Sequence, residues 1–98
     1  MAKIINLLYN QINHEYSISD GPIKYGKNKK NLGLFDIENE LGLDSLIKSI
    51  IFYLPSDKKI ILRIDKILPN QIRDRLVKIL NSPPYKKEKL ITEDFERD

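Results

Sequence analysis

The residues KKIILRID, positions 58–65, decide the fold class of this 98-residue chain. A strand explains why this stretch contains three β-branched isoleucines and why turn residues flank it on either side. Interpreted as part of a helix over 57–68, the same stretch aligns most of its apolar residues on one face but leaves Leu62 off it. Because Leu62 fits only the strand, the sequence predicts a strand at residues 59–64.

With this strand, the chain is predicted to be a small single α+β domain with about four helices and a short sheet. A β-hairpin at residues 15–26 supplies the rest of the sheet, because two short alternating runs flank the turn pair Asp20-Gly21. If residues 57–68 were helical instead, the chain would form an all-α four-helix bundle.

Four helices are predicted from apolar spacing and from start and stop signals. Residues 3–14 carry apolar side chains at helical spacing, and a short helix at 36–41 ends at Gly42. A third helix spans 45–54, and a fourth begins at Asn70 and stops before two prolines. The predicted core comes from the last two helices and consists of Leu46, Ile50, Ile51, Leu54, Ile72, Leu76, Ile79 and Leu80.

Length and composition predict one globular domain at residues 1–85 and a charged C-terminal tail at residues 86–98. The chain has no cysteine, which excludes disulfide scaffolds and thiolate chemistry and suits a reducing, cytoplasmic compartment. Its start does not resemble a signal peptide, and no apolar run approaches membrane-spanning length, so we expect a soluble protein without a membrane partner. The 16 isoleucines, 13 lysines and 8 asparagines indicate a low-GC genome, which by itself supplies many of the lysines.

No catalytic or metal-binding constellation is visible, and we expect a protein that is not an enzyme. The single histidine, His14, has no nucleophile or carboxylate at a suitable spacing. The acidic residues between 36 and 44 lack the glycine-turned loop of a calcium site. With four glycines in the whole chain, there is no nucleotide-binding glycine loop either.

Two basic clusters are the candidate binding residues. The first has a charge of +4 over residues 24–30 and includes a tyrosine that can stack on a base, and the second lies on the exposed face of the last helix. A segment of net charge −3, residues 31–54, separates them. The candidate residues are Lys24, Tyr25, Lys27, Lys29, Lys30, Arg73 and Arg75.

The string ELGLDSL at positions 40–46 resembles the attachment motif of acyl carrier proteins, in which the serine of Leu-Gly-Leu-Asp-Ser-Leu carries 4′-phosphopantetheine. The resemblance implies that Ser45 is the modified residue and that the helix at 45–54 is the recognition helix. A hydroxyl at a helix start lies in the positive field of the helix terminus, which suits a phosphate. The same string also fits a helix end at Gly42 followed by a helix cap at Asp44.

We therefore expect a non-enzymatic protein-binding factor, such as a small inhibitor, an immunity-type protein, a regulator or a minor subunit of an assembly, with a protein as its partner. The net charge of +3 and the pI near 9.1 also allow a nucleic-acid-binding accessory protein that uses the basic clusters. The third alternative is an acyl-carrier-like protein modified at Ser45. We expect no cofactor on the first two hypotheses and 4′-phosphopantetheine on the third.

Overall fold

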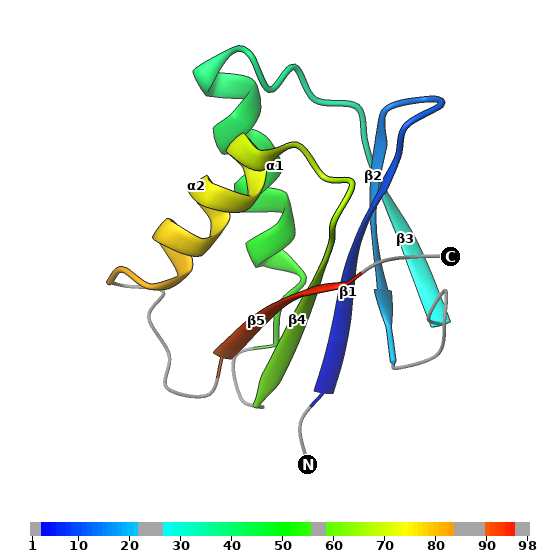
Figure 1. The fold of residues 1–98 in the computed structure, drawn as a ribbon, viewed down its shortest axis with the longest axis vertical. Helices are drawn as coiled ribbons and strands as arrows, with labels where there is room; N and C mark the ends of the chain where they lie inside the picture. Colours follow the sequence, from blue (N-terminus) through cyan, green and yellow to red (C-terminus); the bar gives the residue numbers. More distant parts are fainter. Residues whose placement is uncertain (1–2, 22–26, 56–58, 84–89, 96–98) are drawn as a thin grey trace.

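A computed structural model describes residues 3–21, 27–55, 59–83 and 90–95 (Figure 1). It contains one five-stranded sheet with the strand order β3-β2-β1-β4-β5. In chain order the elements are β1 (Lys3–Asn10), β2 (Glu15–Asp20), β3 (Lys27–Gly33), α1 (Glu40–Phe52), β4 (Ile60–Asp65), α2 (Asn70–Leu80) and β5 (Leu90–Phe95).

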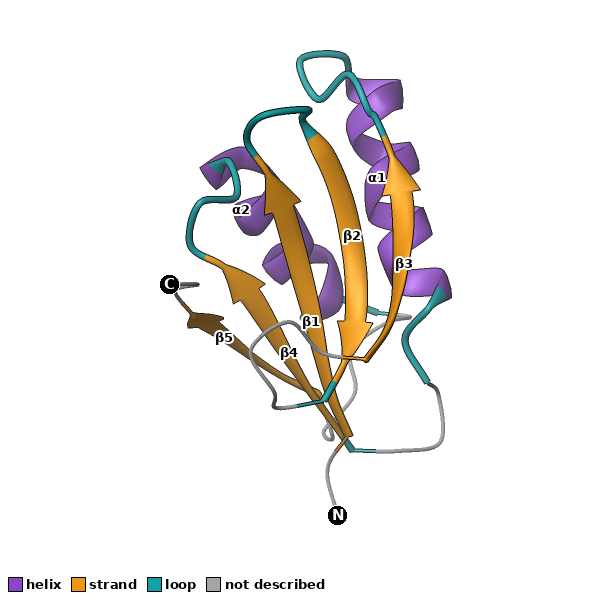
Figure 2. Cartoon of the chain, turned by 90° about the vertical axis from the view of Figure 1, so that its right-hand side faces the viewer, coloured by secondary structure: helices purple, strands orange, loops and turns teal. Residues whose placement is uncertain are grey.

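The sheet is mixed. β1 and β2 pair antiparallel, as do β2 and β3, whereas β4 runs parallel to both β1 and β5. Parallel neighbours need a crossover connection, and α1 and α2 provide one before and one after β4. Both helices cover the same face of the sheet, α1 on the β3 side and α2 on the β4 side (Figure 2).

The core lies between the two helices and this face. Alternate residues of the central strands point into it, and Leu7 and Leu62 are fully buried. Of the predicted core residues, Leu46, Ile50, Ile72, Leu76 and Leu80 are buried, and Ile51, Leu54 and Ile79 are partly buried against them. The predicted core is confirmed, but it is only the helical half of the real one.

The prediction of four helices with a short sheet is wrong, and so is the all-α alternative, because the described residues form two helices and a mixed sheet of five strands. The strand predicted at residues 59–64 is confirmed as β4. Residues 3–14, predicted as a helix, contain β1 instead. The reason is that this central strand buries apolar side chains on both faces, Leu7 on one and Leu8 on the other, which removes the alternation that marks a strand.

The hairpin predicted at residues 15–26 is confirmed for its first strand, which is β2. β2 ends at Asp20, and Gly21 follows with φ of +95°, a turn conformation that glycine permits. The partner of β2 is β3, which begins at Lys27, while residues 22–26 lie outside the described residues. β3 has the polar sequence KNKKNLG and carries no local strand signal.

The two helices predicted at 36–41 and 45–54 are one continuous helix, α1. It begins after Asn39, whose side-chain oxygen accepts a hydrogen bond from the backbone N–H of Leu41 at 2.9 Å. Gly42 does not end a helix but lies inside this one, where a β-carbon would overlap the backbone carbonyl of Asp36. The glycine is required by this close approach and not by a left-handed turn.

The segment assigned to a charged tail contributes a strand. β5 pairs with β4 from Ile60↔Leu90 to Asp65↔Phe95, so residues 90–95 extend the sheet. Within the part of the chain that the structure describes, neither helix has the length and apolar character needed to cross a membrane.

Candidate protein interface

The structure distributes the predicted basic residues over distant elements. Lys29 and Lys30 lie on β3 at one edge of the sheet, whereas Arg73 and Arg75 lie on α2 beyond α1 (Figures 1 and 2). The side chain of Lys27 and the whole of Lys24 and Tyr25 lie outside the described residues. The two described clusters therefore belong to different surfaces.

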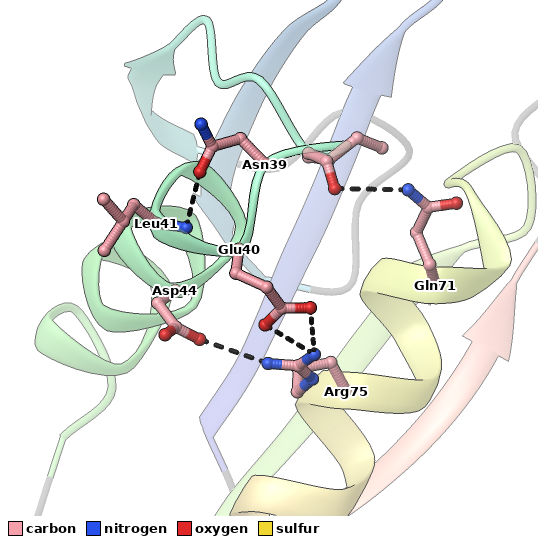
Figure 3. Close-up of polar contacts among 7 residues, drawn as sticks. Asn39, Glu40, Leu41, Asp44, Gln71 and Arg75 are labelled. Atoms are coloured by element: carbon pink, nitrogen blue, oxygen red, sulfur yellow. Dashed lines mark hydrogen bonds and ion pairs between the residues drawn. The ribbon is translucent and has the colours of Figure 1, made fainter.

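Arg75 joins α2 to α1. Its Nη2 donates to both carboxylate oxygens of Glu40 at 3.0 Å, and its Nη1 donates to Asp44 at 3.2 Å (Figure 3). Beside this bridge, the side chain of Gln71 donates to the backbone carbonyl of Ile37 at 3.4 Å. The guanidinium is hydrogen-bonded to two carboxylates of α1, so Arg75 links the two helices.

Arg73 joins α2 to two strands. Its Nε lies 3.0 Å from a carboxylate oxygen of Asp94 on β5, and its Nη2 donates to the backbone carbonyl of Asp65 at the end of β4 at 3.3 Å. Only 19% of its side chain is exposed. Both arginines thus have structural partners within the chain.

A different surface lies between β3 and the C-terminal half of α1. A hollow of about 350 Å³ is found there. Its lining residues come from the edge strand and from the last two turns of the helix with its cap, and they are Asn31, Leu32, Lys48, Ser49, Phe52 and Tyr53. We call this hollow, together with Lys29 and Lys30 on the strand beside it, the β3–α1 surface.

An exposed aromatic pair is its main apolar feature. Phe52 is 80% exposed, although it is a large apolar residue on an ordered helix, and Tyr53 is 37% exposed. Their rings meet edge to face with centroids 5.3 Å apart, and the ammonium of Lys30 lies 5.1 Å from the Tyr53 centroid. Exposed aromatic residues are enriched in protein interfaces.

The surface is also positively charged. Lys29 and Lys48 are exposed, and like Lys30 they form no ion pair with any residue in the described ranges. The arginines of α2, by contrast, are neutralised by carboxylates. An approaching acidic group therefore finds several available cations on the β3–α1 surface, whereas among the described basic residues of α2 both arginines are paired and Lys78 alone is exposed without an ion pair.

A second groove, of about 510 Å³, lies on the other side of α1. Each helix lines it with residues spaced at i, i+3, i+4 and i+7, which are Asp44, Ile47, Lys48 and Ile51 on α1 and Arg75, Lys78, Ile79 and Ser82 on α2 and just after it. Lys48 belongs to both hollows. The Arg75 bridge occupies one end of this groove, which leaves less of it for a partner.

The aromatic cluster near the β1–β2 turn is structural. The hydroxyl of Tyr9 lies 2.8 Å from Nδ1 of His14, and its ring lies 4.9 Å from that of Tyr16. Burial, with a smaller contribution from Tyr9, raises the pKa of Tyr16 to about 12, so its hydroxyl stays protonated at neutral pH. In the described ranges, no three His, Asp or Glu side chains come together as a metal site.

Ser45 does not lie at a helix start. α1 begins at Glu40, so the Ser45 hydroxyl is in its second turn and exposed to solvent. The field of a helix terminus acts within the first turn. The helix-terminus geometry expected to favour a phosphate on Ser45 is therefore absent, and Leu43 and Leu46 of the motif are buried.

Two of the residues on the β3–α1 surface are among the binding residues predicted from the sequence, and the others are not. Lys29 and Lys30 were candidates, whereas Phe52 and Tyr53 belong to the helix predicted at residues 45–54, whose sequence SLIKSIIFYL carries apolar residues on most of its sides. The apolar residues on several sides of this helix indicate that some of them are exposed, because a helix that packs on one face cannot bury apolar residues on every side.

The chain matches no family model, no curated protein and no solved structure.

Proposed function

We propose that this chain is a non-enzymatic, cytoplasmic protein-binding factor, of the kind found among small inhibitors, immunity-type proteins, regulators and minor subunits, and that it binds its partner through the β3–α1 surface. The observation that carries the proposal is the exposure of Phe52, 80% open to solvent and packed on Tyr53 beside the edge of the sheet.

The energetics favour a protein partner. Burying one exposed Phe side chain contributes roughly 1.5–3 kcal/mol to binding. Since Phe52 is anchored on a helix and packed against a neighbouring ring, ordering it on binding costs little conformational entropy. The ammonium groups of Lys29 and Lys48, which form no ion pair with another described residue, then select a partner whose surface is acidic.

A nucleic-acid partner is our second proposal. Exposed aromatic rings beside lysines can stack on bases while the ammonium groups contact phosphates. This alternative has fewer cations than the sequence suggested, because Arg73 and Arg75 are paired with carboxylates. We therefore rank it below a protein partner.

The test is native co-purification from the host with three chains: wild type, Phe52→Asp and Ile12→Asp. Ile12 is a matched control, since it is an apolar residue 93% exposed on the β1–β2 turn, away from the β3–α1 surface. We expect wild type and Ile12→Asp to retain the same protein and Phe52→Asp to lose at least about tenfold of it.

Two results would contradict the proposal. Equal recovery of the protein by all three chains would remove Phe52 from the interface. Recovery of nuclease-sensitive material whose binding falls steeply with salt would favour the nucleic-acid alternative.

A further inference from the structure

β3 is an edge strand with one side open. In the described part of the chain it pairs with β2 alone, and it is the last strand of the sheet order. An edge strand offers a row of backbone N–H and C=O groups to any extended chain that reaches it. The φ angles of Asn28 (54°) and Gly33 (98°) bound the open edge at residues 29–32, and within it the pairing with β2 shifts register on either side of Lys30 and Asn31.

The side chains of this segment divide between the two faces of the sheet. Lys30 contacts the Tyr53 ring, and Leu32 packs against the core and lines the hollow, so both lie on the helix face. Asn31 borders the hollow, but it pairs with Ser17 and its side chain donates to Glu15 on the opposite face, and Lys29 shares that face by alternation. A strand added at this edge would place its alternate side chains next to the hollow and next to Lys29.

A second copy of the chain is a poor occupant of this edge. Three of the seven residues of β3 are lysines, and antiparallel pairing of two β3 strands would bring lysines close to one another. Like charges opposite each other destabilise a strand pair. The charge of the edge instead complements an acidic segment.

We infer that the partner contributes an extended segment as an added strand on β3, with apolar residues directed into the hollow beside Phe52 and acidic residues directed toward Lys29. This inference rests on the proposed function, because it names the kind of partner that the β3–α1 surface recognises. Backbone hydrogen bonds would supply affinity, and the alternation of apolar and acidic side chains would supply specificity.

The first experiment measures peptide binding to the full chain by fluorescence anisotropy. The probe is a labelled seven-residue peptide in which glutamate alternates with valine around one central phenylalanine. Its control is an isomer of the same composition with all glutamates at one end. We expect the alternating peptide to bind at least about tenfold more tightly than the isomer, because only alternation separates the two kinds of side chain between the two faces. Equal affinity, or no binding of either peptide, would overturn the inference.

The second experiment tests the backbone. Two further peptides carry N-methyl groups on the odd or on the even residues, and both leave every side chain and the charge unchanged. In an added strand, only one of these sets of N–H groups points at β3. We expect one methylated peptide to lose at least about tenfold in affinity and the other to bind like its parent.

The outcomes separate this inference from the proposed function. Equal binding by the two methylated peptides would overturn strand addition, while loss of the native partner with Phe52→Asp would still support the interface. Conversely, if Phe52→Asp retains the native partner and the methylated peptides still differ, strand addition at β3 stands and the proposed function fails.

Discussion

Ile50 and Phe52 lie two residues apart on α1 and differ completely in their surroundings. Ile50 is fully buried, as is Leu76 on α2, whereas Phe52 is 80% exposed. Replacing either buried side chain by alanine removes apolar contacts and leaves a cavity, so we expect Ile50→Ala and Leu76→Ala each to lower the free energy of unfolding by about 2–5 kcal/mol. For Phe52→Ala we expect a change within about 0.5 kcal/mol. Urea unfolding followed by circular dichroism gives these values, and similar losses for all three variants would mean that Phe52 is part of the core.

The burial of Tyr16 makes the stability of the chain depend on pH, because it raises the pKa of the phenol in the folded state. Its pKa is raised from 10.0 to about 12 in the folded chain, mainly by burial, so the folded state holds the phenolic proton more tightly than the unfolded state does. The contribution to stability is complete below pH 10 and is lost as the pH rises toward about 12.

We therefore expect the free energy of unfolding to fall more steeply over this range in wild type than in Tyr16→Phe, which lacks the ionisable group. Urea titrations at several pH values measure both slopes. The two proteins share every other ionisable group, so the difference between their slopes belongs to Tyr16. Parallel slopes would show that Tyr16 ionises as freely in the folded chain as in the unfolded one.

At the scale of elements, Gly42 shows how contact with a neighbouring loop can reverse the effect on stability that helix propensity predicts for a Gly→Ala substitution. In an exposed helix, Gly→Ala stabilises by about 1 kcal/mol. In α1 the new β-carbon would overlap the carbonyl of Asp36 and lie 2.9 Å from its carbonyl carbon, and both are backbone atoms that cannot rotate away. We expect Gly42→Ala to destabilise the chain by about 1–3 kcal/mol in thermal or urea unfolding. A stabilised variant would show that the loop before α1 moves freely.

Charge reversal should lower the stability of the chain when it is made at the predicted arginines, but not when it is made at the predicted lysines. Arg73 and Arg75 connect α2 to β5 and α1, so Arg73→Glu with Arg75→Glu places like charges against their carboxylate partners. We expect a loss of at least about 1 kcal/mol, kept small by the partial exposure of these pairs. Lys29→Glu with Lys30→Glu changes the same number of charges, and we expect the melting temperature to stay close to that of wild type. If the lysine pair proves the more destabilising, β3 depends on its lysines for folding.

The elements predicted from sequence are those with a complete local signal. α2 has one apolar stripe, a proline at its start and two prolines after its end, and β4 has β-branched residues between turns. β1 lacks such a signal because a central strand is apolar on both faces, and β3 lacks it because its polar residues become a strand only by pairing with β2. The proposed interface follows the same rule, since the lysines of β3 can be recognised in the sequence by their charge, whereas the exposure of Phe52 depends on how α1 packs.

At the scale of the whole molecule, the parallel half of the sheet depends on contacts that no local pattern shows. β1 meets β4 with Lys3 opposite Ile60, and β4 meets β5 with Ile60 opposite Leu90. β4 is therefore enclosed between two parallel strands, and α2 crosses over to bring β5 into place. Residues 90–95, whose composition resembles that of a charged tail, are thus part of the sheet.

Deletion of residues 84–98 tests this arrangement. It removes β5, exposes the row of backbone groups along β4 from Ile60 to Asp65, and takes the Asp94 carboxylate away from Arg73. Each lost backbone hydrogen bond costs about 0.5–1.5 kcal/mol, and the total approaches the 5–15 kcal/mol that stabilises an ordinary domain. We expect the shortened chain to be largely unfolded at room temperature, as seen by circular dichroism and by loss of dispersion in the ¹H–¹⁵N NMR spectrum. A chain lacking only residues 96–98 keeps every described strand and serves as the control. A folded chain without residues 84–98, with the melting temperature of the control, would show that the domain is complete without β5.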